Sequence, residues 1–544
     1  MSEARGTTGS TRREFLRTGG MLAAGMSVAP LLSACATIAP GQGINVEEIS
    51  IADLQAAMTA GRLDSETLVQ MYLTRIQAID RSGPILRSVQ ELNPDAVAIA
   101  RSLDEERRAK RVRGPLHGIP ILLKDNIATA DKMETTAGAL ALVGAKPRED
   151  STIARQMREA GLVILGKASL SEWAYFKSQP GSSGWSARNG QARNPYALDR
   201  TPCGSSAGSA IAVAASLVTV SIGTETDGSI ICPAGVNGVV GIKPTVGLTS
   251  RAGVIPISAT QDTVGPFGRT VADAAALLGA MTGVDPRDAA TQASAGKSET
   301  DYTRFLDANG LRDVRIGVPR EGYFGYSPKA DAAANQAIAA MREHGAVIID
   351  PVKIPNFDRA ALTAAEIIVF LYEFKAGVNA YLAKLPPGAQ VHTMEEIIAF
   401  NKKNPAENLP YFGQEWLERA QAKGSLSEQE YLDAREKCRR LAGTEGFDVV
   451  MQENQLDVLV APTTTPAWTI DLVNGDAIRG SSAKSAALTG NPLISVPSGF
   501  VMGLPVGVTF MGRAWSEPTL IKTAYAYEQA TKARRPPQYP PTLP

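Results

Sequence analysis

The sequence predicts an α/β fold with a parallel or mixed β-sheet at its centre. Two apolar runs, at 118–123 and 163–166, are typical of buried strands, and the segment 150–160 between them predicts a helix. Because parallel neighbouring strands need a crossover connection, this strand–helix–strand order indicates parallel pairing. The length of 544 residues allows one large domain or two fused domains.

Three helices are predicted before this unit. The segments 51–60 and 65–79 carry apolar residues at helical spacing, and Asp64 or Ser65 can cap the second of them. The third helix, at 94–110, ends in a charged run that is typical of a solvated helix face. We assign these helices a packing role and no chemistry.

The chain after this unit contains a long polar loop and further strands and helices. A loop as long as 171–202 inside a compact domain is either functional or disordered, and its two tryptophans argue against disorder. The small-residue run 210–222 predicts a buried helix between two clusters of glycine and serine. Strands are predicted at 238–244 and 262–266, followed by a helix at 270–282.

The segment 300–455 is more polar and rich in predicted helices, which indicates a subdomain or an insertion that could cover a site. Its predicted elements are strands at 315–318 and 346–350 and helices near 331–343, 359–383, 393–403, 412–423 and 427–446. Three strands, at 456–462, 491–497 and 505–510, then complete the predicted sheet. A helix at 518–533 precedes a proline-rich tail.

The N-terminal segment is predicted to be an export signal. Residues 11–17 have the twin-arginine pattern, and the modest apolar stretch 19–32 is too short for a permanent membrane-spanning helix. The following Leu32–Cys35 segment resembles a bacterial lipobox, in which Cys35 would be acylated. We therefore expect export through the twin-arginine pathway, to the periplasm or to a lipid anchor on the cell envelope.

Composition restricts the classes of protein that the chain can represent. A formal net charge of zero gives no indication of a nucleic-acid partner. Four cysteines without a C-x-x-C pair argue against a zinc ribbon and a disulfide-rich scaffold. Of the three histidines, only His117 lies near other suggestive residues as a base for a Ser–His–Asp hydrolase. This scarcity makes a base other than histidine worth considering.

Two glycine- and serine-rich clusters, at 203–209 and 223–230, are the strongest candidates for a functional site. Glycine-rich backbone can approach a ligand closely and direct several N–H groups at one atom, and a serine in such a turn can be a nucleophile. Composition alone equally allows two flexible loops around a buried helix. Lys124 ends the predicted strand 118–123, where a lysine side chain usually extends to water.

These residues lie in blocks that resemble the amidase signature family. The blocks are Pro115–Asn126, Cys203–Ser209, Gly223–Ile230, Gly241–Thr245, Asp262–Pro266 with Arg269, and Gly490–Gly507, in the family's order. The resemblance spans about 46–530 and implies a large mixed twisted β-sheet core that helices cover on both faces, with a helical insertion. The implied organisation is a signal at 1–35, a tether at 36–45, an amidase domain at 46–535 that includes the variable segment 300–455, and a tail at 536–544.

The resemblance implies an amidase with a Ser–cis-Ser–Lys triad of Lys124, Ser205 and Ser229, whose serine interval matches the family's spacing. Ser229 would attack the amide carbonyl, and Ser205 would relay the proton between Ser229 and Lys124. Lys124 can be the base only if burial lowers its pKa by several units from ~10.4. The product would be the acid plus ammonia or an amine, without a metal or cofactor.

The second cluster would also supply the oxyanion hole. The backbone N–H groups of Thr226, Asp227, Gly228 and Ser229 would hold the tetrahedral oxyanion. Ser206 would support the turn rather than take part in proton transfer. His117 becomes structural in this scheme.

Two positions depart from the family's usual pattern. Asp227-Gly228 stands where many members have Gly-Gly, which is tolerable if the Asp227 side chain points away from the hole. Ile231 stands where many members have arginine, so any charge contact of that arginine is absent. Cys203 and Cys232 flank the two serines closely. They could pair in an oxidising compartment, but we expect buried free thiols.

The substrate implied by the resemblance is an aryl, acyl or peptide amide. We expect the loop 171–202, with Gln179 at a substrate-lining position, and the segment 300–455 to select it. One alternative is the glutaminase-type subunit of a tRNA amidotransferase, which the export signal argues against. Another is a catalytically inactive tethered binding protein, which the retained triad argues against. A nucleotide binder lacks support, because no G-x-G-x-x-G follows a strand.

The partners expected from the sequence are few. They comprise a small-molecule amide substrate, no nucleic acid, and a membrane only through the signal or a lipid anchor. The sequence leaves open whether the protein is a monomer or a homodimer.

Overall fold

The computed structural model describes residue 41 and residues 43–543. The predicted export signal, including Cys35, lies outside the described residues, as does most of the predicted tether. None of the helices in the described residues is long and apolar enough to cross a membrane.

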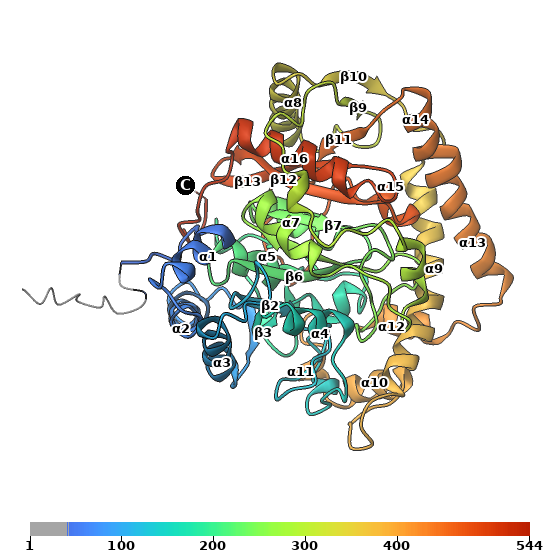
Figure 1. The fold of residues 1–544 in the computed structure, drawn as a ribbon. Coiled ribbons are helices and arrows are strands. Elements are labelled where there is room, and N and C mark those ends of the chain that lie inside the picture. The colour runs from blue at the N-terminus through green and yellow to red at the C-terminus, as the bar shows by residue number, and fades with distance from the viewer. Residues whose placement is uncertain (1–40, 42, 544) are drawn as a thin grey trace, which may run out of the picture. The chain divides into compact units, whose positions relative to one another are not determined.

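A mixed β-sheet forms the centre of the fold (Figure 1) and confirms the predicted α/β class. Within the described residues it has eleven strands in the order β1-β3-β2-β6-β8-β7-β12-β13-β11-β9-β10. The strands are β1 (Val89–Leu92), β2 (Pro120–Lys124), β3 (Val163–Ala168), β6 (Val220–Glu225), β7 (Val240–Lys243), β8 (Thr263–Gly268), β9 (Arg315–Pro319), β10 (Val347–Val352), β11 (Val458–Pro462), β12 (Leu493–Val501) and β13 (Leu504–Met511). Strand β2 pairs in parallel with both β3 and β6, as the strand–helix–strand order predicted for β2 and β3.

Helices cover both faces of this sheet, as the resemblance implied. Alternate residues of β11 show the two faces: Val458 and Val460 pack with α7 (Val271–Gly279), α8 (Pro328–Glu343) and α16 (Glu517–Thr531). Their neighbours Leu459 and Ala461 pack with α14 (Asp448–Glu453) and α15 (Lys484–Thr489). Because successive side chains of a strand point to opposite faces, the two helix groups lie on opposite sides of the sheet.

The N-terminal half packs its helices around β1, β2, β3 and β6 in a separate core cluster. The helices are α1 (Ile51–Thr59), α2 (Ser65–Arg75), α3 (Ala96–Arg108), α4 (Thr152–Glu159) and α5 (Ala207–Ala214). The predicted buried helix at 210–222 is wrong in its bounds, because the helix ends at Ala214 and β6 begins at Val220. The β-branched run Val218-Thr219-Val220 favours the strand at that point.

The segment 300–455 divides into two parts. Strands β9 and β10, with α8, extend the main sheet at its far edge and do not form a separate subdomain. The rest is helical: α9 (Arg359–Leu382), α10 (Met394–Lys403), α11 (Pro405–Asn408), α12 (Glu415–Gln421) and α13 (Gln429–Arg439). Helix α13 packs along α9 (Figure 1).

The long polar loop 171–202 is ordered against this helical part. It contains a short 3₁₀ turn (Glu172–Tyr175) and a two-stranded ribbon of β4 (Trp185–Ser186) and β5 (Gly190–Gln191). The Phe176 ring stacks on Trp416 at 5.3 Å between centroids and meets Phe374 edge-on at 5.0 Å. The loop's two tryptophans also pack edge-on, Trp173 on Phe374 at 6.4 Å and Trp185 on Tyr411 at 5.9 Å between centroids. Aromatic packing of this kind offsets the entropy lost by ordering a long loop.

Candidate active site

The candidate site lies at the carboxyl ends of the parallel strands β2 and β6. Lys124 is the last residue of β2. Ser229 follows β6 in the turn before α6 (Ile231–Val236), and Ser205 lies in the turn before α5. A hydrogen bond of 3.2 Å from Ser206 N to Ser229 O joins the two serine turns. Open α/β sheets place their ligand sites at this end of the strands.

The Lys124 side chain is completely buried, so the alternative in which it extends to water is wrong. Its Nζ lies 2.7 Å from Ser205 Oγ, 2.8 Å from Thr224 Oγ1 and 3.2 Å from Thr224 O. Burial lowers the pKa of Lys124 to about 7, although the charges of Asp262 and Glu225 act in the opposite direction. A neutral amine keeps two hydrogens for Thr224 and has a lone pair for the Ser205 hydroxyl proton.

Ser205 is fixed from several sides. Its peptide bond with Gly204 is cis, the geometry that the resemblance implied. Ser171 N donates to Ser205 O at 3.0 Å, which joins the polar loop to the turn. A Cβ on Gly204 would lie 2.3 Å from Ser171 Oγ, so a larger residue would displace this hydroxyl, which accepts from Gly184 N at 2.9 Å.

The residues Thr226–Ser229, here called the oxyanion loop, present unpaired backbone donors. Within the described residues, none of their four N–H groups donates a hydrogen bond. Gly228 has φ +85°, a conformation that glycine adopts readily and other residues rarely. Ser229 itself is half-buried, so a ligand can reach it. Free N–H groups in one turn are the means by which proteins stabilise an oxyanion.

Glu225 holds the chain directly after the oxyanion loop. Its Oε2 accepts from Ile230 N at 2.6 Å and from Ile231 N at 2.9 Å, at the start of α6. Burial raises the pKa of Glu225, although the Lys243 charge and these two N–H groups oppose the rise. Sequence reasoning missed Glu225, because nothing in the local pattern shows that its side chain turns back to cap the next helix.

The side chains of Thr226 and Asp227 in the oxyanion loop form hydrogen bonds with residues outside the loop. Thr226 Oγ1 donates to Asp262 Oδ1 at 2.6 Å. The Asp227 carboxylate accepts from Lys484 Nζ at 2.5 Å, so an ion pair holds the side chain that replaces a glycine of many relatives. Lys484 also contacts Glu366 of α9. Sequence reasoning missed both Lys484 and Glu366.

The structure places the remaining predicted residues as follows. Ser206 Oγ donates to Thr224 O at 2.9 Å and accepts from Thr224 N at 3.2 Å, within the turn. His117 is buried with its Nε2 2.9 Å from Leu103 O, away from the triad. Gln179 lines a cavity of about 500 Å³ that contains none of the triad residues.

The expectation that Cys203 and Cys232 are free thiols is wrong, because they form a disulfide. Cys203 precedes the Ser205 turn and Cys232 lies in the first turn of α6, after Ser229. The turns that bring the two serine clusters together therefore also bring the cysteines together, with 6.0 Å between their Cα atoms. Their positions beside the two serines allowed this pairing, but a spacing of 29 residues does not by itself predict it.

Replacing both Cys203 and Cys232 with alanine is expected to lower the free energy of unfolding by about 3.6 kcal/mol, since the bond closes a loop of roughly 30 residues in the unfolded chain. Denaturant unfolding of the variant measures this change. The matched control is Cys438→Ala, a buried thiol without a disulfide, for which a smaller loss is expected. Mass spectrometry of the digested, unreduced protein should detect the peptide that contains both cysteines. Absence of this peptide would contradict the pairing.

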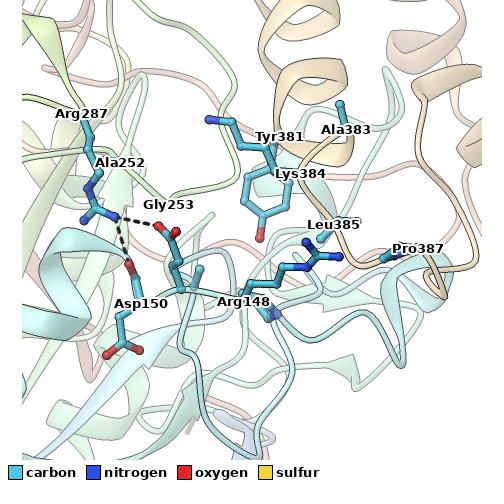
Figure 2. Close-up of a pocket in the computed structure, with 13 residues that line it drawn as sticks. Arg148, Asp150, Ala252, Gly253, Arg287, Tyr381, Ala383, Lys384, Leu385 and Pro387 are labelled. Carbon is cyan, nitrogen blue, oxygen red and sulfur yellow. Dashed lines mark hydrogen bonds and ion pairs between the residues drawn. The ribbon is translucent and has the colours of Figure 1, made fainter.

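A further cavity lies away from the triad in the described part of the chain (Figure 2). It has a volume of about 820 Å³ and is lined by Arg148, Gly253, Arg287, Tyr381 in the last turn of α9, and residues 383–385 directly after that helix. Arg287 spans its edge, with 3.5 Å to the Glu149 carboxylate. None of the triad residues lines this cavity, so its size does not identify it as the reaction site.

Known proteins are similar to this chain over most of its length. The structure matches the native peptide amidase of Stenotrophomonas maltophilia with a TM-score of 0.86 and 53% identity, over 91% of this chain and 99% of that chain. A probable amidase of Arabidopsis thaliana is 43% identical over 91% of this chain and 92% of its own. A glutamyl-tRNA(Gln) amidotransferase subunit from Chloroflexus aurantiacus is 36% identical over 90% of this chain and 97% of its own.

These likenesses define the class of the protein, a hydrolase that acts on amides. The model of the amidase family matches residues 67–521, and the chain therefore belongs to the amidase family. The sheet and the blocks that carried the resemblance lie within this match.

Proposed function

We propose that this amidase works through an acyl-enzyme on Ser229, with Ser205 as proton relay and Lys124 as base. The single observation that carries the proposal is the 2.7 Å contact between Lys124 Nζ and Ser205 Oγ at a lysine whose pKa burial lowers to about 7. A lysine that is neutral near pH 7 can remove the hydroxyl proton of Ser205. Ser205 can in turn accept the hydroxyl proton of Ser229.

The reaction follows from this arrangement. The Ser229 oxygen attacks the amide carbon, its proton passes to Ser205, and the Ser205 proton passes to Lys124. The N–H groups of the oxyanion loop stabilise the tetrahedral oxyanion. Lys124 then returns a proton through Ser205 to the leaving nitrogen, and the C–N bond breaks. Water attacks the ester carbon, its proton travels by the same relay back to the Ser229 oxygen, and the acid leaves.

A fluorophosphonate probe tests the nucleophile. We expect the probe to label the wild-type protein once, and peptide mapping to place the adduct on Ser229. Labelling of another serine, or none while amides are still hydrolysed, would refute the proposed mechanism.

The substrate class that we propose is a peptide amide. Its support is the likeness to the peptide amidase, which extends over 99% of that chain. The test compares ammonia release from a peptide amide, an aryl amide, a simple acyl amide and glutamine. Preference for glutamine would favour the glutaminase alternative that the amidotransferase relative suggests, and hydrolysis of none would favour a binding protein.

The pH dependence of the reaction is expected to report Lys124. Because the base must be neutral, kcat/KM for a substrate without ionisable groups should rise with pH and level off above an apparent pKa of about 7. Burial also raises the pKa of Glu366 to about 7, so the control is Glu366→Gln, in which the inflection should persist. A profile that is flat from about pH 5 to 9 in both proteins would contradict Lys124 as the base.

We further propose that the protein is exported through the twin-arginine pathway and anchored by a lipid on Cys35. The support is the motif at 11–17, the lipobox at 32–35 and the disulfide, a bond typical of oxidising compartments. Cell fractionation of Arg12→Lys/Arg13→Lys should show retention in the cytoplasm. Cys35→Ala leaves the arginines intact, so this variant should still be exported but should no longer be anchored to the membrane.

A further inference from the structure

A cluster of three charged side chains lies beside the oxyanion loop. Lys484 Nζ, at the start of α15, donates to Asp227 Oδ2 at 2.5 Å and also to Glu366 of α9. The side chains of Lys484 and Glu366 are 8% and 3% exposed, whereas that of Asp227 is 22% exposed. A buried cation between two carboxylates is the arrangement in which removal of one partner has a large effect.

A second series of contacts connects helix α9 to Thr226, at the other end of the oxyanion loop. Gln261 Nε2 donates to Glu366 Oε1 at 2.9 Å and lies 3.5 Å from Thr226 O. The next residue, Asp262, accepts from Thr226 Oγ1 at 2.6 Å. The contacts therefore close a ring in which Glu366 reaches the loop through Lys484 on one side and Gln261 on the other.

The two carboxylates keep Lys484 charged, and Lys484 in turn offsets the negative charge of Asp227. Burial lowers the pKa of Lys484, but Asp227 and Glu366 outweigh burial and raise it above its usual value, so Lys484 stays charged. Asp227 carries one of the proposed oxyanion N–H groups, and its carboxylate would repel an oxyanion there. Lys484 offsets the negative charge of Asp227 close to the place where the oxyanion of the transition state forms.

We propose that Lys484 and Glu366 are positioning residues for the oxyanion loop, through which helix α9 sets how well the hole stabilises the transition state. The inference rests on the proposed function, because it gives the loop N–H groups their catalytic role. Donors aimed at an oxyanion act only at one geometry, and a misplacement of about 1 Å costs on the order of 10²-fold in rate. Gly228, with its permissive backbone, gives the loop no stiffness of its own.

The test uses Lys484→Met and the nearly isosteric Glu366→Gln in the full-length enzyme. We expect kcat to fall about 100-fold in Lys484→Met and about 10-fold in Glu366→Gln, with KM within about threefold of wild type. Affinity for a peptide boronate, whose adduct on Ser229 needs the hole, should fall in parallel with kcat. The control is Glu528→Gln, a largely buried carboxylate of α16 that accepts from Val271 N at 2.8 Å and is expected to keep wild-type kinetics.

A double variant distinguishes positioning from general destabilisation. Adding Asp227→Gly to Lys484→Met removes the loop carboxylate that has lost its cation and restores the Gly-Gly of many relatives, so kcat should recover by about tenfold. The recovery stays partial, because Glu366 still lacks its cation and the loop still lacks its contact with Lys484. If Lys484→Met does not fold, Glu366→Gln alone decides the question. Wild-type kcat and boronate affinity in folded Glu366→Gln would overturn the inference.

The outcomes of this test separate the inference from the proposed function. Failure of a fluorophosphonate to label Ser229 in the wild-type enzyme counts against the proposed function. Normal labelling of wild type together with unchanged kcat in both variants counts against the positioning role alone.

Discussion

Substitution of Ser229 by alanine is expected to lower kcat for amide hydrolysis by about 10⁴-fold or more, because no other hydroxyl can form the acyl-enzyme at this position. The residual rate should come from the oxyanion loop and from binding alone. Substrate affinity should change little, since the Ser229 hydroxyl forms its decisive bond only in the reaction. The measurement is single-turnover ammonia release, together with loss of fluorophosphonate labelling.

The matched control for this variant is Ser221→Ala. Ser221 is a buried serine of β6, the strand that leads into the oxyanion loop, and its hydroxyl donates to Ser209 O at 2.8 Å. Its loss should cost about 1 kcal/mol of stability and leave kcat within about threefold. Undiminished hydrolysis in Ser229→Ala would refute the mechanism, because it would require a different nucleophile.

The features that the sequence predicted are those with local signals. The buried strand before Lys124, the next strand at 163–166 and the two glycine–serine clusters all carry patterns within a few residues. The mixed sheet follows from the alternation of such segments, and its class is confirmed. The assignment of Lys124, Ser205 and Ser229 came from the resemblance, and the structure brings their turns together.

The features that the sequence did not predict depend on distant parts of the chain. Asp227 and Lys484 pair across 257 residues, and Lys484 and Glu366 across 118, so no local pattern indicates either contact. The Cys203–Cys232 pairing was predicted wrongly, since it depends on how two turns meet in space. Small side chains around Lys484 resemble any buried helix start, and only the tertiary structure shows the two carboxylates that receive its charge.

Replacing Lys124 with methionine is expected to lower kcat by about 10³-fold or more, because Ser205 then has no group to receive its proton. Lys124→Arg should not restore activity, since a guanidinium stays protonated and cannot act as a base. Both variants should still bind a substrate analogue. A loss of less than tenfold in folded Lys124→Met would show that another group takes the proton.

The same substitution is expected to stabilise the fold in a pH-dependent manner. The pKa of Lys124 is about 7 in the folded protein and near 10.5 when the residue is free in water. Between these values the unfolded chain binds one proton more than the folded protein, so the stability of wild type rises with pH in this window. At pH 7, folding must therefore remove the proton from Lys124, which costs on the order of 4 kcal/mol. Methionine avoids this cost, although it loses the hydrogen bonds that Lys124 forms.

The measurement is the difference in unfolding free energy between Lys124→Met and wild type, at pH 7 and at about pH 10. The advantage of the variant should be largest at pH 7 and should shrink toward pH 10, where both states of wild type approach the same charge. The buried Lys167 and Lys243, whose pKa values burial lowers to about 8, are present in both proteins and cancel in the difference. A difference that does not change with pH would mean that Lys124 titrates alike in the folded and unfolded chains, and a lysine of that kind cannot serve as the base at neutral pH.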